Sequence, residues 1–262
     1  MRTTSRHRQE EHQVITSLTS PKIARVRRLL ETQNPRERAE SGQFVVEGLR
    51  AVESALGSRS IDVVEILATS QWLARFPEAT EISEEVAWKI ADTVSPQGIF
   101  AVLSLPKQQI DLKGAKRIAL FVELQDPGNA GTVIRNAHAF DFDLVIFSKG
   151  SVDPFSGKVA RASAGSIASV PIEFGIELAP LIETLRPTHQ LVAFDMDGEE
   201  VGSIERTLPT VVIFGNEARG LPEEIRGDER IKKISIPMPG GTESLNVASA
   251  ATIAMYEISR RD

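Results

Sequence analysis

The chain has 262 residues, of which 41% are hydrophobic and 25% charged, the composition of an ordinary globular protein with a sizeable core. The absence of cysteine excludes disulfides, thiolate metal sites and cysteine nucleophiles. The net charge of −6 argues against binding nucleic acid through charge alone, and no apolar run approaches the ~18 residues of a membrane-spanning helix.

The beginning of the chain is polar and basic. Residues 1–15 are predicted to form a polar tail, because they lack the apolar centre of a signal peptide. Residues 1–30 hold seven basic and two acidic residues, so the remaining chain carries a net charge of −11. A basic arm on an acidic body fits a polyanionic partner, and a solvated helix face explains these charges equally well.

Residues 16–106 predict a small α/β domain. Ser20 as a cap, followed by Pro21, predicts the start of a helix whose apolar stripe leaves Arg25 and Arg28 on the other side. Strand-like and helix-like segments then alternate up to Pro106. We expect strands at 43–48, 63–69 and 98–106, and helices at 49–56, 70–76 and 85–92.

The polar segment 107–116 is predicted to be a linker, and a second domain is predicted at 117–262. Apolar strand-like runs recur at 118–124, 144–149, 170–174, 191–195, 210–215 and 232–238. Most are separated by helix-length segments, which favours a parallel sheet covered on both faces. In such sheets, binding sites form in the loops beyond the carboxyl ends of the strands.

The first unusual loop, DPGN at 126–129, lies between an apolar strand and a helical pattern. Asn129 can cap this helix, and Gly128 and Gly131 let the main chain approach another molecule closely. Arg135 lies roughly 150° from the centre of the apolar stripe of the helix. Taken alone, a structural corner followed by a solvated arginine explains the same residues.

Two further loops share this character. In VVIFGNEARGL, a buried strand ends at Gly215, and the polar residues Asn216, Glu217 and Arg219 follow. A strand-to-helix turn with an ion pair explains this pattern equally well. In the third loop, prolines and glycines at 237–241 force an irregular path, after which Ser244-Leu245-Asn246 opens a final helix rich in small residues.

Other chemistries fail on spacing. A Walker loop needs four residues between its glycines, whereas six separate Gly150 from Gly157. No Gly-x-Gly-x-x-Gly follows the early strands, and no Gly-x-Ser-x-Gly elbow is present. The four histidines show no metal-ligand spacing. Kinases, dehydrogenases and hydrolases are therefore disfavoured.

Together, the three loops resemble the ordered motifs of the SpoU family of RNA ribose 2'-O-methyltransferases, which belongs to the SPOUT superfamily and includes the TrmH-like enzymes. The motifs read LQDPGNAGTVIRNA, VIFGNEARGL and ISIPMPGGTESLNVASAA. VDPFSGKVARASAG at 152–165 also resembles a family segment, so the resemblance covers residues 116–262. The N-terminal part, with SPKIARVRRLL and GQFVVEGLRAVESAL, is similar to the small substrate-binding domain of many members.

This resemblance implies an α/β-knot fold, in which a mainly parallel sheet carries a deep trefoil knot and follows a small ribosomal-protein-like α/β domain. S-adenosyl-L-methionine would bind in a bent shape at the knot formed by the second and third loops. By motif position, Gly215, Ile236, Met238 and Leu245 would hold this cofactor. Family members are typically homodimers whose sites use residues from both subunits.

The resemblance also assigns catalytic roles. Arg135 is the family's proposed activator of the ribose hydroxyl, and because a guanidinium is far too weak a base, we expect it to stabilise the developing alkoxide or to orient a phosphate. Asn129, Glu217, Ser244 and Asn246 complete the expected catalytic set. The sulfonium is already cationic, so no metal is expected. Ala218 stands where many members have glycine, and this difference does not change the expected activity.

We therefore expect a cytoplasmic, S-adenosylmethionine-dependent enzyme that methylates a ribose 2'-hydroxyl in structured RNA. Ribosomal RNA is favoured over transfer RNA because of the extra domain, and antibiotic-resistance methylation is a further option. The RNA would be held by Arg25, Arg27, Arg28 and Arg161. The alternatives are a non-catalytic RNA-binding or ribosome assembly factor that retains the fold, and a small-molecule enzyme on an ordinary doubly wound sheet.

Overall fold

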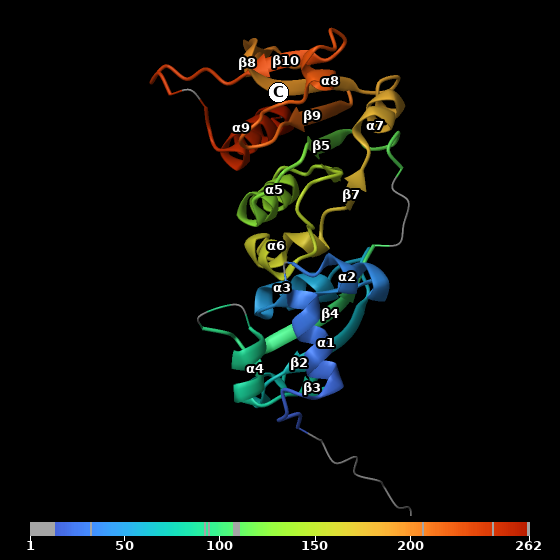
Figure 1. Cartoon of the computed structure of the whole chain (residues 1–262), viewed down its shortest axis with the longest axis vertical. Coiled ribbons are helices and arrows are strands. Elements are labelled where there is room, and N and C mark those ends of the chain that lie inside the picture. The colour runs from blue at the N-terminus through green and yellow to red at the C-terminus, as the bar shows by residue number, and fades with distance from the viewer. Residues whose placement is uncertain are drawn as a thin grey trace, which may run out of the picture.

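The computed structural model of the chain describes residues 14–31, 33–91, 93, 95–106, 111–205, 207–242 and 244–260. These residues form two β-sheets with their helices, stacked along the long axis of the molecule (Figure 1). We refer to residues 14–106 as the N-terminal part and to 111–260 as the C-terminal part. Most of the predicted tail, and residues 107–110 of the predicted linker, lie outside the described residues. None of the described helices is long and apolar enough to cross a membrane.

The N-terminal part contains a four-stranded sheet in the order β1–β4–β2–β3. Its strands are β1 (Gln43–Glu47), β2 (Val63–Ala68), β3 (Thr80–Glu81) and β4 (Ile99–Ser104). β1 and β2 run antiparallel to β4, whereas β3 runs parallel to β2. Its helices are α1 (Pro21–Leu30), α2 (Pro35–Ser41), α3 (Leu49–Leu56) and α4 (Glu84–Ile90). α1 and α4 bury their apolar side chains against one face of the sheet, and α3 against the other.

Most elements predicted for this part are confirmed. Pro21 is the first residue of α1 and Ser20 stands at its N-cap, although the Ser20 side chain makes no capping hydrogen bond. The helix predicted at 70–76 is wrong beyond its first turn, since only Ser70–Trp72 is helical, as the 3-10 helix η1. The indole of Trp72 donates to the carbonyl of Gln97 at 2.6 Å and Phe76 is buried, so the segment packs as a turn.

The C-terminal part contains a six-stranded sheet in the order β10–β8–β9–β5–β6–β7. Its strands are β5 (Arg117–Phe121), β6 (Leu144–Ser148), β7 (Ile172–Ile176), β8 (Gln190–Glu200), β9 (Thr210–Phe214) and β10 (Lys232–Ser235). Its helices are α5 (Pro127–Ala139), α6 (Gly157–Ala162), α7 (Leu178–Leu185), α8 (Glu223–Arg226) and α9 (Val247–Ser259). Every pairing between these strands is parallel, so the predicted parallel sheet is confirmed.

Helices cover both faces of this sheet, as its continuous apolar strands predict. Alternate strand side chains pack against α5, α6 and α9 on one face, and against α7 and α8 on the other. The predicted stripe of α5 is fully buried, while Arg135 is exposed. Because β5 pairs directly with β9, the loops that follow these two strands emerge side by side. α9 then packs beside α5, which brings the third loop to the same edge (Figure 1).

Candidate functional site

A cavity of about 880 Å³ lies where β9 ends and where β8 continues past its pairing with β9, beside the segment that follows β10. This is the edge at which parallel α/β sheets bind ligands. Its walls come from residues 194–196, from 214–221 with Arg226, and from residues between 234 and 250. The residues predicted to hold the cofactor all line it, namely Gly215, Ile236, Met238 and Leu245. The two loops predicted to form the cofactor site therefore share one cavity.

Gly215 has no room for a side chain. A Cβ atom built there would lie 2.2 Å from the carbonyl carbon of Gly220 and 2.4 Å from the amide nitrogen of Leu221. The close approach is fixed by two backbone hydrogen bonds of 2.9 Å, exchanged between Asn216 and Gly220 directly after β9. The main chain of the second loop therefore folds back on itself along the cavity wall, and only glycine fits at its start.

A chain of hydrogen bonds joins the three loops. The Nδ2 atom of Asn246 donates to Oδ1 of Asn129 at 3.0 Å, and Nδ2 of Asn129 donates to Oε1 of Glu217 at 3.3 Å. The Glu217 carboxylate also accepts from the backbone amides of Gln125, at 3.2 Å, and of Asp126, at 3.1 Å. Three of the five residues predicted to be catalytic are thus in direct contact, although the sequence separates them by 88 and 117 positions.

These donors control the ionisation of Glu217. Partial burial acts to raise the pKa of Glu217, but hydrogen bonds from the backbone amides of Asp126, Glu217 and Gln125, and from the Asn129 side chain, outweigh it. The pKa of Glu217 therefore lies below its ordinary value of 4.5. At neutral pH the residue is a fixed carboxylate that organises donors, and it is not poised to take up a proton.

We predict that Glu217→Gln removes a pH-dependent contribution to stability. A carboxylate whose pKa is depressed in the folded state stabilises the fold above the pKa of the unfolded chain, and this contribution is lost as pH falls through the folded pKa. The unfolding free energy of the wild type should exceed that of the variant at pH 7. The gap should narrow as pH falls below 4.5. Denaturant titrations between pH 3 and 7 measure it, with Glu78→Gln as the control for loss of one exposed carboxylate. A gap that is constant with pH would contradict the assigned ionisation.

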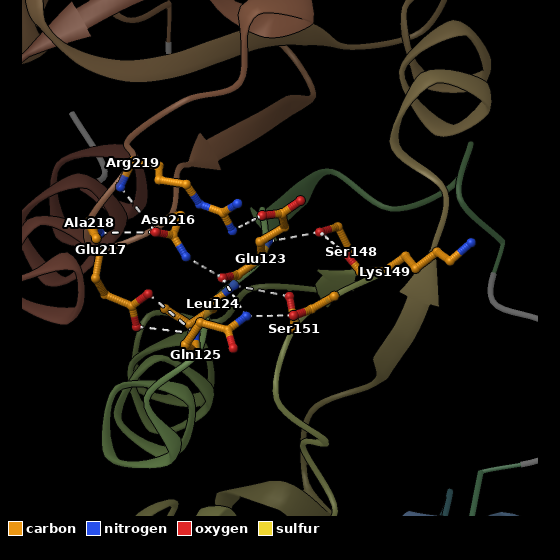
Figure 2. Close-up of polar contacts among 11 residues, drawn as sticks. Glu123, Leu124, Gln125, Ser148, Lys149, Ser151, Asn216, Glu217, Ala218 and Arg219 are labelled. Atoms are coloured by element: carbon orange, nitrogen blue, oxygen red, sulfur yellow. Dashed lines mark hydrogen bonds and ion pairs between the residues drawn. The ribbon is translucent and has the colours of Figure 1, made fainter.

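Glu123 holds the first loop against the second. Figure 2 shows the side chains of Asn216 and Arg219 both directed at this residue. Nδ2 of Asn216 donates to the carbonyl of Glu123 at 2.8 Å, and Arg219 forms an ion pair with its carboxylate. Glu123 adopts a φ of 52°, a left-handed conformation that is uncommon outside glycine, and its amide donates to the Ser148 hydroxyl at 2.9 Å. The loop that presents donors to Glu217 is therefore fixed from both sides.

Two details of the first loop correct the sequence analysis. The side chain of Asp126 caps α5 by accepting from the amide of Asn129 at 2.8 Å, so the prediction that Asn129 caps this helix is wrong. Helix α5 begins at Pro127, which leaves the Asn129 side chain free to join the other loops. Gly131 faces α6, where a Cβ would lie 2.3 Å from the Cβ of Ala162. Its small size allows two helices to pack, and the expectation of contact with another molecule is wrong there.

The remaining predicted catalytic residues occupy two different places. Ser244 is exposed and lines the cavity beside Leu245. Arg135 is exposed on α5, does not line the cavity, and forms no ion pair with any residue in the described ranges. The structure therefore brings Ser244 to the candidate site and leaves the guanidinium of Arg135 free at the surface of the same chain.

The predicted RNA-binding arginines lie apart from the cavity. On α1, Arg27 is exposed and Arg25 half-buried, and the structure gives neither an ion pair within its described residues. Arg28 pairs with Glu37, with Nε and Oε2 at 2.9 Å. Arg161 is half-buried in the last turn of α6. Arg25 and Arg27 are thus the most available of the four for an anionic ligand.

Sequence reasoning missed one wall of the cavity. Phe194, Asp195 and Met196 line it from β8, and Nε of Arg226 donates to Asp195 at 3.1 Å across the same wall. The signal was present, because Asp195 is the polar residue at the end of the apolar run 191–195. In a parallel sheet that position faces the ligand edge.

Comparison with known proteins identifies the family. Residues 116–256 match the model of the SpoU rRNA methylase family, and residues 20–101 match that of the MRM3-like substrate binding domain. This chain belongs to the SpoU rRNA methylase family. The matched ranges hold the six-stranded sheet with its cavity and most of the four-stranded sheet, respectively.

Individual relatives of this SpoU family member extend over nearly the whole chain. The 23S rRNA (guanosine(2553)-2'-O)-methyltransferase RlmP of Bacillus subtilis is 31% identical over 250 residues, which cover 92% of this chain and 98% of that protein. The 23S rRNA (uridine(2479)-2'-O)-methyltransferase of Streptomyces viridochromogenes is 29% identical and covers 89% of this chain and 87% of its own length. The AdoMet-bound rRNA methyltransferase of Sinorhizobium meliloti superimposes with a TM-score of 0.79 at 26% identity, covering 94% of this chain and 97% of that one.

Proposed function

We propose that this protein transfers a methyl group from S-adenosylmethionine to a ribose 2'-hydroxyl in structured RNA, and that its RNA is ribosomal. The observation that carries the proposal is the cavity whose walls combine the second and third family motifs and contact the first through Glu217 and Asn246. Two relatives that match both parts of the chain are named for 2'-O-methylation of 23S rRNA, which supports ribosomal over transfer RNA.

The cavity suits S-adenosylmethionine in size and chemistry. Its volume of about 880 Å³ lies within the range of small-molecule sites. Ile236, Met238 and Leu245 offer apolar surface for an adenine ring, while the folded-back main chain at Gly215 offers backbone polar groups. The ion pair of Asp195 with Arg226 adds polar groups to the same wall. These residues fit the cofactor that is bound in the S. meliloti relative.

The proposed reaction forms a bond between the ribose 2'-oxygen and the methyl carbon while the bond from that carbon to sulfur breaks. S-adenosylmethionine supplies an electrophilic methyl group and leaves as S-adenosylhomocysteine, and the hydroxyl proton passes to solvent. Positioning the oxygen in line with the sulfur supplies much of the rate. We assign this positioning to Ser244, Asn246, Asn129 and Glu217, and stabilisation of the developing negative charge to Arg135.

We propose a division into a polar tail at 1–15, an RNA-binding domain at 16–106, a linker at 107–116 and a methyltransferase domain at 117–262. We also propose a deep trefoil knot in the last of these, as the family resemblance implies, formed by the second loop and by the segment that lines the cavity between β10 and α9. Exposed Ile253 and Tyr256 on α9 support a homodimer formed through this domain. We further propose that the protein works in the cytoplasm, where ribosomal RNA is found.

Methyl transfer tests the proposal directly. Purified protein, tritiated S-adenosylmethionine and ribosomal RNA extracted from cells should yield labelled RNA, and nuclease digestion should release a 2'-O-methylated nucleoside. Calorimetric titration should show saturable binding of S-adenosylmethionine and S-adenosylhomocysteine. RNA binding without cofactor binding or transfer would favour the ribosome assembly factor instead. Labelled base with unlabelled ribose would overturn the assigned reaction.

We predict that Arg25→Ala with Arg27→Ala weakens RNA binding without affecting the cofactor site. Each arginine that contacts a phosphate releases counterions, so its loss lowers the slope of log affinity against log salt by about one. The magnitude of this slope should therefore be smaller by up to about two in the double variant than in the wild type. Filter binding at several salt concentrations measures the effect, and Arg59→Ala, another exposed arginine of the N-terminal part, is the matched control. An unchanged slope would remove α1 from the RNA surface.

A further inference from the structure

Arg38, in α2, is buried at the boundary between the two parts of the molecule. Its side chain is 1% exposed. Nη1 donates to the carbonyls of Leu29 and Glu31, at 2.8 and 2.7 Å, and Nε donates to Oδ2 of Asp153 at 2.7 Å. Leu29 and Glu31 belong to the end of α1, whereas Asp153 lies in the C-terminal part. One guanidinium thus connects the predicted RNA-binding helix to the domain that holds the cavity.

The contact is costly to form and specific in geometry. A buried charge is tolerated only when its donors are satisfied by well-placed acceptors, and the planar fork of arginine fixes their directions. The carbonyls at a helix end lack partners within the helix, so Arg38 satisfies groups that only the end of α1 presents. Asp153 is itself oriented, because its Oδ1 accepts from the amide of Phe155 at 2.8 Å. The bridge therefore specifies one orientation of α1.

The boundary around this bridge is closely packed. A Cβ at Gly157, the first residue of α6, would lie 2.6 Å from the carbonyl oxygen of Leu30. The rings of Phe44 and Phe155 are 4.9 Å apart, and buried side chains of both parts form one apolar cluster. Figure 1 shows α2 and α3 directly below α6. The segment 152–165 serves this boundary, and none of its residues lines the cavity.

We propose that Arg38 is a positioning residue for RNA, and this inference rests on the proposed function. By tying the end of α1 to Asp153, it holds Arg25 and Arg27 at a fixed place relative to the methyl-transfer site. The two parts then bind RNA as one rigid surface, and the predicted linker does not act as a flexible tether. Arg38 is buried and touches no RNA, so it acts through α1.

The first test is Arg38→Met, which keeps an unbranched side chain and removes the bridge. If the orientation that binds RNA falls to about a tenth of the population, the KM for RNA rises about tenfold. The kcat at saturating RNA and the Kd of S-adenosylmethionine should stay unchanged. Asp153→Asn, which keeps an acceptor but loses the charge, should raise the same KM by a smaller factor and provides a milder variant if Arg38→Met folds poorly.

A covalent replacement of the bridge makes the test specific. The hydroxyls of Ser54 and Ser169, one in each part, are 3.3 Å apart. Because the chain has no cysteine, Ser54→Cys with Ser169→Cys introduces a single possible disulfide, and thiol titration verifies its formation. In the Arg38→Met background, oxidation should restore the wild-type KM for RNA, and reduction should abolish the rescue. In the otherwise unchanged protein, oxidation should alter neither KM nor kcat.

Two results would overturn the proposal. In the protein that carries only Ser54→Cys and Ser169→Cys, oxidation could abolish activity and a reductant could restore it. That result would mean that the two parts must move relative to each other. An Arg38→Met protein whose kcat and cofactor affinity fall together with its RNA affinity, and which the disulfide does not rescue, would mean that Arg38 supports folding only. RNA affinity is also measured by filter binding, which needs no methyl transfer. The role of Arg38 is therefore tested even if the wild type methylates nothing.

Discussion

Replacing Arg135 by alanine should lower kcat by about a hundredfold to a thousandfold, the range observed when one charge-stabilising donor is removed from an active site. Arg135 is exposed and forms no ion pair in the described structure, so its loss should cost little stability. It does not line the cavity, so the Kd of S-adenosylmethionine should be unchanged.

Single-turnover methyl transfer measures the effect of Arg135→Ala on kcat, and calorimetry of cofactor binding is the control. Arg135→Lys, which keeps the charge and loses the planar fork, should retain part of the activity. Full transfer by Arg135→Ala would refute the assigned role.

The position of Arg135 also predicts how the proposed homodimer shares its sites. Within one chain the guanidinium lies outside the cavity, so we expect it to serve the cavity of the partner. Co-expression of Arg135→Ala with a Gly215 variant then yields mixed dimers. In each of these, the Arg135→Ala chain contributes an intact cavity, and the Gly215 variant contributes an intact arginine to it. Random pairing should restore about a quarter of wild-type activity. No recovery from two inactive variants would place Arg135 at the cavity of its own chain.

The elements that the sequence predicted are those with local causes. The apolar runs of β5, β6 and β9 and the stripe of α5 follow from residues close together in the chain, and the structure has them where expected. A parallel sheet then places the loops after β5 and β9 at one edge, which pattern and topology predicted, whereas the site roles of Gly215 and Glu217 were implied by the family resemblance. The family resemblance added Ile236 and Leu245, which no spacing rule distinguishes from other apolar residues.

What the sequence could not provide depends on contacts between distant segments. In the sequence, Arg38 is one of several charged residues of a polar helix. No neighbouring residue indicates its contact with Asp153, which lies 115 residues away. Gly131 was misread for the same reason, since only the packing of α6 explains its size. The error at the start of α5 was local: both Asp126 and Asn129 are good capping residues, and the choice between them depends on whether Pro127 is the first helical residue.

The largest effect on the cofactor should come from Gly215→Val. The new Cβ would lie 2.2 Å from the carbonyl carbon of Gly220, so the main chain of the second loop must move. Overpacking of this kind costs about 1–3 kcal/mol. Because the displaced loop lines the cavity, we expect a weakening of S-adenosylmethionine binding on the order of a hundredfold, which corresponds to about 2.7 kcal/mol. Calorimetry measures it directly.

Gly240→Ala is the matched control, because a Cβ at Gly240 meets no atom of the described residues within 4 Å and its conformation does not require glycine. That variant should bind the cofactor as the wild type does, although it lies in the third loop. RNA affinity separates a local effect at Gly215 from unfolding. The arginines of α1 belong to the other sheet, so a folded Gly215→Val protein should still bind RNA. Wild-type affinity of that variant for the cofactor would mean that the second loop does not form its binding site.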